Sequence, residues 1–113
     1  MLKIYHNNRC RKSREALAML EEKGLEHEVI DYMNNPLTED QLENLLDKLE
    51  MSPEDLVRVK EADWKENFKG KELDDAEVIL AMIEYPKLME RPIIETDEKA
   101  VLARPAEKME EIL

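Results

Sequence analysis

The sequence predicts a small α/β domain in which a mixed sheet is flanked by helices and interrupted by a helical insertion. Three observations lead to this fold class. Two short apolar segments enclose a helical pattern within residues 2–32. Helical spacing then runs almost unbroken over roughly residues 38–84, and a polar turn at 97–99 separates two apolar segments near the C-terminus. The length of 113 residues suits a single domain with one modest core.

The N-terminal region is expected to form a strand–helix–strand unit. Apolar residues at 2–5 indicate a short strand, and Leu17 and Leu20 lie at helical spacing after it. Gly24 can supply the left-handed residue that ends the helix, and residues 29–32 indicate a second strand. Because a helical crossover of this length joins neighbouring strands that run the same way, the two strands should be parallel.

The insertion is expected to be built from capped helices. Thr38 and Gln41 have the spacing of a capping box, and Ser52 followed by Pro53 marks another helix start. The first of these helices carries a regular apolar stripe at Leu42, Leu45, Leu46 and Leu49. A further helix is expected over residues 74–84, with four residues facing inward: Ala76, Ile79, Leu80 and Ile83.

The C-terminal region indicates a β-hairpin followed by a helix. A strand is expected over residues 91–95 with a proline at its start, where a strand tolerates one. Its partner is expected over residues 100–103. A final helix is expected from Ala106 to Leu113, with Pro105 at its first position.

The composition limits the kind of partner. The net charge is −11, with 40% charged and 42% hydrophobic residues. This balance argues against nucleic acid and against an anionic membrane surface as partners. There is one cysteine, which excludes an internal disulfide, and the two histidines are too isolated to indicate a metal site. No signal peptide or membrane-spanning stretch is evident, so we expect the protein in the reducing cytoplasm. We also expect a monomer, because no long unpaired apolar patch is evident.

Cys10 is the strongest candidate for a functional residue. It lies between the first strand and the first helix, where free N–H groups and the helix dipole favour a thiolate. Four cations surround it within six positions, Arg9, Arg11, Lys12 and Arg14. A structural cysteine would lie in an apolar pattern, whereas this one has arginine on both sides, so a reactive thiol is the preferred interpretation. His6 is either a solvated histidine at the strand end or a group that tunes the thiol.

Three arginines stand in distinctive surroundings. Arg58 follows an apolar pair, Arg91 precedes Pro92, and Arg104 precedes Pro105. A residue before proline is held extended, so the backbone direction of the last two is fixed. Taken singly, each arginine could equally be an ordinary solvated surface residue.

Together these segments resemble the glutaredoxin-dependent arsenate reductases. The resemblance rests on four motifs, which are HNNRCRKSREAL at 6–17, LVR at 56–58, LMERPII at 88–94 and ARP at 103–105. It implies a thioredoxin-like fold with a helical insertion, and it implies Cys10 as the nucleophile. It further implies an oxyanion site formed by Arg58, Arg91 and Arg104.

The resemblance also implies supporting roles around the nucleophile. His6, Ser13 and Arg14 lie in or beside the cysteine motif, and Pro92 matches a proline that the thioredoxin-like fold holds in a cis bond. The chain departs from the family at two places. It has Asn7–Asn8 where Asn-Pro is usual, and Arg11–Lys12 where small residues usually follow the cysteine.

The number of cysteines determines which partners are needed. Reducing arsenate takes two electrons and a second thiol, which this chain lacks, and Ser13 occupies the position of a second cysteine in a dithiol motif. We therefore expect no bound cofactor, glutathione as a co-substrate and a glutaredoxin as a partner. Three alternatives stay open: a glutathione-dependent monothiol oxidoreductase with another substrate, an Spx-type regulator that binds RNA polymerase, and a scaffold without catalysis.

Overall fold

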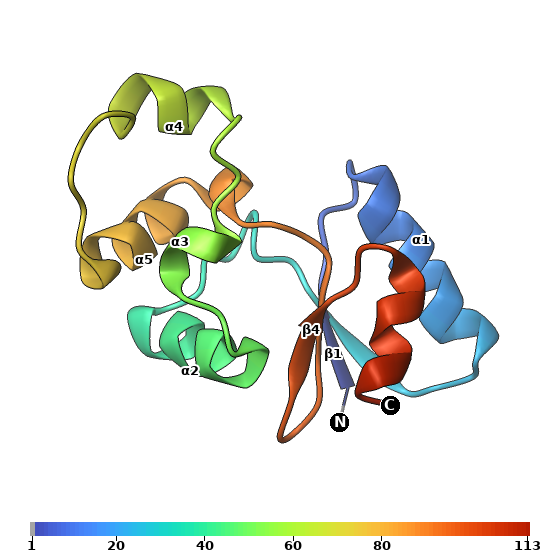
Figure 1. Cartoon of the computed structure of the whole chain (residues 1–113). Helices are drawn as coiled ribbons and strands as arrows, with labels where there is room; N and C mark the ends of the chain where they lie inside the picture. Colours follow the sequence, from blue (N-terminus) through green and yellow to red (C-terminus); the bar gives the residue numbers. More distant parts are fainter. Residues whose placement is uncertain (1) are drawn as a thin grey trace. The chain divides into compact units, whose positions relative to one another are not determined.

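The computed structural model describes residues 2–113, which form two compact units (Figure 1). The first unit, the sheet unit, combines residues 2–35 with residues 91–113. The second, the helical unit, comprises residues 36–90. No helix within residues 2–113 is both long enough and apolar enough to cross a membrane.

The sheet unit contains a four-stranded mixed sheet. Its strands are β1 (Leu2–Tyr5), β2 (His27–Ile30), β3 (Ile93–Glu95) and β4 (Ala100–Leu102). They are arranged in the order β2-β1-β3-β4. Strand β1 pairs parallel with β2 and antiparallel with β3, which forms a hairpin with β4. The predicted α/β class, the parallel first pair and the C-terminal hairpin are therefore confirmed.

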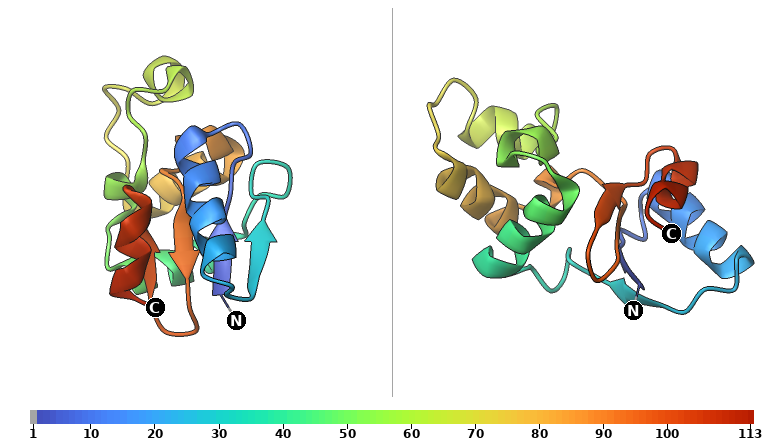
Figure 2. Two further views of the ribbon diagram at one scale, coloured as in Figure 1. Left: turned by 90° about the vertical axis from the view of Figure 1, so that its right-hand side faces the viewer. Right: turned by 60° about the horizontal axis from the view of Figure 1, so that its bottom comes forward.

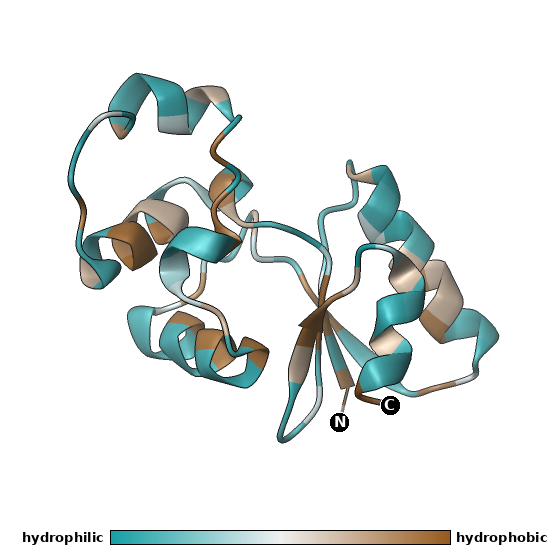
Figure 3. Cartoon of the chain, in the orientation of Figure 1, coloured by the Kyte–Doolittle hydropathy of each residue, from teal (hydrophilic) through white to brown (hydrophobic). Residues whose placement is uncertain are grey.

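Two helical segments lie side by side on one face of this sheet, α1 (Arg11–Glu22) and η2 (Ala106–Glu111) (Figure 2). The core between them is apolar and fully enclosed, with Ile4, Ile94 and Leu20 all at 0% exposure. Figure 3 shows the C-terminal strands as largely apolar ribbons. On the other side of the sheet, the Tyr5 hydroxyl donates a buried 2.6 Å hydrogen bond to Glu95.

Helix α1 ends as the sequence predicts. Gly24 has φ +66°, its N–H donates to the carbonyl of Glu21, and the Leu25 N–H donates to the carbonyl of Leu20. These paired bonds form a Schellman motif, which satisfies the last carbonyls of the helix. The motif turns the chain back toward β2, which ends at Ile30, two residues before the expected end.

The helical unit contains four α-helices and a short 3₁₀ turn. They are α2 (Glu39–Leu49), α3 (Pro53–Leu56), α4 (Ala62–Asn67), α5 (Asp75–Glu84) and η1 (Pro86–Leu88). The predicted capping box at Thr38 and Gln41 is present, and Asp74 forms a second one with Glu77. Leu42, Leu45 and Leu46 of the predicted stripe are buried. Helix α4 is largely hydrophilic (Figure 3) and buries none of its residues.

Two sequence predictions need correction. The inward face of α5 is formed by Val78, Ile79, Ala81 and Met82, so only Ile79 of the predicted set is buried. Seven of its ten residues are apolar, and spacing alone therefore could not select a face. The last helix is a 3₁₀ helix that stops at Glu111, and Pro105 precedes it as an extended N-cap. The 3₁₀ geometry places Ala106 and Met109 on the same side, toward the core.

Candidate active site around Cys10

The sheet register brings three chain segments to one edge. Tyr5 of β1 lies opposite Ile93, and Ile93 lies opposite Leu102 of β4. The end of β1, the start of β3 and the end of β4 therefore meet at the same edge of the sheet. The loop that carries Cys10 leaves from the first of these, and the Arg91–Pro92 and Arg104–Pro105 pairs occupy the other two. Both X-Pro bonds are cis.

The cysteine loop is held by its own hydrogen bonds. The Cys10 N–H donates to the carbonyl of Asn7 (2.9 Å), which closes a tight turn. The Asn7 side-chain oxygen accepts from the N–H of Arg9 (3.0 Å), as in an Asx turn. Arg14 donates from Nη1 to the carbonyl of Asn8 (3.0 Å) and so connects the turn to the first turn of α1. Arg14 thus braces the loop.

Cys10 is the N-cap residue of α1, with φ −94° and ψ 122°, and it is partly exposed. Its side chain closes no capping hydrogen bond, but the N–H groups of Ser13 and Lys12 face the sulfur. Burial raises the pKa of the thiol. The Ser13 N–H, the hydrogen bond and charge of Arg91 and the Lys12 N–H outweigh burial, so the pKa of Cys10 lies below its ordinary value.

Arg91 has donors beyond the one that serves the sulfur. Its Nε and Nη1 are buried, and neither has a hydrogen-bond partner within the described part of the chain. Buried guanidinium donors are costly unless an acceptor satisfies them, and their planar fork fits an oxyanion. Arg91 therefore presents unsatisfied donors beside a thiol whose pKa is lowered.

His6 acts on this site through Ser13. A hydrogen bond of 2.7 Å joins His6 Nδ1 and Ser13 Oγ, and the N–H of Asn7 also donates to that oxygen (3.0 Å). Ser13 is fully buried and His6 is 7% exposed. His6 is therefore not a solvated histidine. It fixes the residue whose N–H faces the Cys10 sulfur.

The other two predicted arginines have different settings. Arg104 is exposed and belongs to the sheet unit, where its N–H donates to the carbonyl of Leu102 (2.9 Å). Arg58 belongs to the helical unit. Its N–H donates to the carbonyl of Leu88, and its Nη1 donates to Glu61 Oε1 at 2.6 Å. The Arg58 and Glu61 side chains are only 25% and 28% exposed.

The structure thus connects Cys10, Ser13, His6 and Arg91 by direct contacts, with Arg14 bracing the loop and Pro92 beside Arg91. Arg58 belongs to the helical unit, and its hydrogen bonds given above are to residues of that unit. Over residues 2–113, no group of three or more metal-ligating side chains is found.

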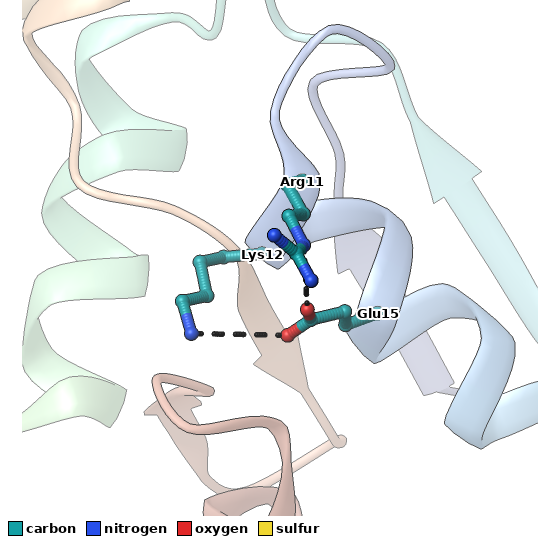
Figure 4. Close-up of polar contacts among 3 residues, drawn as sticks. All are labelled: Arg11, Lys12 and Glu15. Carbon is teal, nitrogen blue, oxygen red and sulfur yellow. Dashed lines mark ion pairs between the residues drawn. The ribbon is translucent and has the colours of Figure 1, made fainter.

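Two acidic residues that pair with cations singled out in the sequence were not predicted. Glu15 pairs with both Arg11 (3.3 Å) and Lys12 (3.9 Å), as Figure 4 shows, and Glu61 pairs with Arg58. The signal was present in the sequence, because each acid lies three or four residues after its cation, a spacing that brings side chains together on a helical turn.

Comparison with known proteins identifies relatives of this chain in both sequence and structure. The ArsC family model matches residues 5–112. The uncharacterized protein YfgD of Escherichia coli is 46% identical, over 99% of this chain and 96% of that protein. A Neisseria meningitidis protein named arsenate reductase is 39% identical, with coverage of 99% and 97%. The solved structure of an arsenate reductase from Vibrio cholerae has a TM-score of 0.94 at 39% identity, covering 99% and 97%. These likenesses confirm the predicted thioredoxin-like fold.

Proposed function

Because the chain belongs to the ArsC family, we propose that it reduces arsenate with Cys10 as the nucleophile and with electrons from glutathione and a glutaredoxin. One observation carries the proposal. The Cys10 thiol has a lowered pKa and lies against Arg91, which keeps two buried donors without partners in the described chain. A thiolate beside an unsatisfied guanidinium is suited to attack an oxyanion that the guanidinium holds.

The oxyanion is held by arginine. Arg91 precedes β3 and Arg104 follows β4, so both lie at the sheet edge from which the Cys10 loop leaves. The third arginine of the proposed oxyanion site is Arg58, which the family resemblance assigns to it. Arg58 donates to Glu61 from Nη1 alone among the contacts described, and a guanidinium carries five N–H donors. It can therefore bind a second anion while it stays paired.

The first chemical step forms a sulfur–arsenic bond. The Cys10 thiolate attacks the arsenic of dihydrogen arsenate, one arsenate hydroxyl takes the proton of the other and leaves as water, and arsenic stays in its pentavalent state. His6 and Ser13 position the N–H that stabilises the thiolate before this attack. Arg91 stabilises the negative charge on the arsenate oxygens.

The second step is the reduction, and it needs an external thiol because the chain has one cysteine. The sulfur of glutathione attacks the Cys10 sulfur and forms a disulfide. The sulfur–arsenic bond breaks and its electron pair stays on arsenic, which leaves as trivalent arsenite. A glutaredoxin thiol then attacks the glutathione sulfur and restores the Cys10 thiol. We place these steps in the reducing cytoplasm, with the protein acting as a monomer and without a bound cofactor.

The test is arsenate-dependent NADPH consumption in the presence of glutathione, glutaredoxin and glutathione reductase. Activity of the unmodified protein should disappear in Cys10→Ser, which keeps the size of the side chain but lacks the nucleophile. The Lys99→Gln variant, changed in the β3–β4 turn, is the matched control and should keep full activity. If the unmodified protein shows no arsenate-dependent consumption while Cys10 alkylates rapidly near neutral pH, the thiol acts on another substrate.

A further inference from the structure

The surface around Cys10 opposes the charge of the rest of the chain. The protein carries a net charge of −11, yet residues 9–14 contain four cations and no acid. All four are exposed. Arg14 donates to the carbonyl of Asn8, which leaves Arg9, Arg11 and Lys12 as the exposed cations beside Cys10 that do not brace the loop. We refer to these three residues as the loop cations.

The loop cations are not neutralised by acids within the described chain. Arg11 and Lys12 both pair with Glu15, at 3.3 Å and 3.9 Å, so two positive charges share one negative charge (Figure 4). The Arg11 side chain is 84% exposed and the Lys12 side chain 50% exposed. Positive charge in excess of Glu15 therefore remains on both sides of the cysteine in sequence.

This charge differs from that of the oxyanion site in its exposure. The Arg91 donors that face no protein acceptor are buried, whereas the loop cations lie in water. Exposed cations bind weakly and are screened by salt, which suits a co-substrate that must arrive and leave in each cycle. Arginine also matches the geometry of a carboxylate.

We propose that Arg9, Arg11 and Lys12 form a carboxylate-binding surface that positions glutathione for its reaction at the Cys10 sulfur. The inference rests on the proposed function, because it assumes that an external thiol reacts with Cys10. Glutathione fits the surface because it carries two carboxylates and a net negative charge beside its thiol. Without the loop cations, the acidic chain would repel such a molecule.

The proposal can be tested without arsenate through thiol–disulfide exchange. The Cys10 thiolate attacks one sulfur of glutathione disulfide, which forms the Cys10–glutathione disulfide and releases one glutathione thiolate. The same exchange can be run with bis(2-hydroxyethyl) disulfide, which is a neutral reagent, and with cystamine, which is a cationic one. The rates of all three reactions, followed by intact-protein mass spectrometry, separate the reactivity of the thiol from the charge preference of the surface.

Two variants should change the glutathione rate in opposite directions. In Arg11→Gln/Lys12→Gln, the rate with glutathione disulfide should fall about fivefold and the rate with cystamine should rise, with adjustment for any change in the neutral rate. In Glu15→Gln, which releases both cations, the rate with glutathione disulfide should rise about twofold. High salt should reduce both differences.

The matched control is Lys23→Gln/Lys99→Gln, which removes the same charge far from Cys10. Lys23 follows the opposite end of α1, and Lys99 lies in the turn at the opposite edge of the sheet. This variant should change none of the ratios between the three rates.

Each negative result of these experiments leads to a different conclusion. If Cys10 reacts slowly with all three disulfides, the proposed function fails and this inference fails with it. If the neutral disulfide reacts rapidly and the variants leave the glutathione preference unchanged, only the carboxylate surface is refuted. The surface is likewise refuted if the variants slow only the reduction of glutathionylated Cys10 by glutaredoxin, because the cations would then serve a protein.

Discussion

Removal of the Arg91 guanidinium should raise the pKa of Cys10. Arg91 contributes both a hydrogen bond and a positive charge to the thiolate, while the N–H groups of Ser13 and Lys12 would remain in Arg91→Met. A neighbouring opposite charge favours the ionised form of a thiol, and the partial exposure of Cys10 moderates that effect through solvent screening. We therefore expect the pKa of Cys10 to rise in Arg91→Met.

The expected effect on alkylation changes sign with pH. Below the pKa, each unit by which a thiol pKa rises reduces the thiolate fraction about tenfold, but each remaining thiolate becomes about threefold more nucleophilic. The rate with iodoacetamide should therefore be lower at acidic pH and higher at alkaline pH, by about threefold in each direction for every unit of change in the pKa. Rates measured across the pH range by mass spectrometry should give profiles that cross.

Two further variants make this result specific. Arg91→Lys keeps a positive charge without the planar fork and should shift the pKa of Cys10 by less than Arg91→Met does. Lys108→Met removes an exposed charge from η2 and should leave the profile unchanged. An unchanged pKa in Arg91→Met would refute the role assigned to Arg91. A rate that moves in the same direction at every pH would also refute it, since that result reports access to the sulfur.

Three other predictions follow from named contacts. Glu61→Gln removes the carboxylate 2.6 Å from Arg58, which frees the guanidinium for arsenate. In the coupled assay the KM for arsenate should fall about threefold while kcat changes little. An unchanged KM would show that Arg58 does not belong to the oxyanion site. Leu20→Ala, at a fully enclosed site, should cost about 2–5 kcal/mol in urea denaturation and leave the pKa of Cys10 unchanged. The Lys23 ammonium lowers the pKa of Glu110 in the folded state, so their pair should stabilise the protein above the unfolded glutamate pKa of about 4.3. That stabilisation should disappear as the pH falls through the folded pKa, so Lys23→Met should lower Tm at neutral pH but not at strongly acidic pH.

Local sequence patterns predicted the parts of the fold that depend on neighbouring residues. The capping box at Thr38 and Gln41 and the helix end at Gly24 are settled by groups a few residues apart. The buried face of α5 depends instead on which elements pack against it, and a helix that is apolar on most sides does not encode that choice. The form of the C-terminal helix likewise depends on packing, because its 3₁₀ geometry brings Ala106 and Met109 into a core whose other residues are distant in sequence.

The candidate site shows the same division. Cys10 and the cations around it could be recognised from their position between a strand and a helix. Local pattern could not bring Arg91 to Cys10, because that contact joins residues far apart in the chain through the pairing of β1 with β3, and only the family resemblance suggested it. The sequence also could not reveal that His6 reaches the thiol through Ser13, since that depends on how the loop folds back onto the helix.

The single cysteine and the distribution of positive charge around it are related features of the site. A chain with one thiol cannot complete a two-electron reduction by itself, so under the proposed function its site receives two unlike anions in turn. An oxyanion that is to react needs fixed donors sheltered from water, as at Arg91, because a low dielectric strengthens each contact. A co-substrate that must leave needs contacts that water and salt weaken, as at Arg11 and Lys12. Under the two proposals, the difference in burial between these cations separates the two binding tasks around one sulfur.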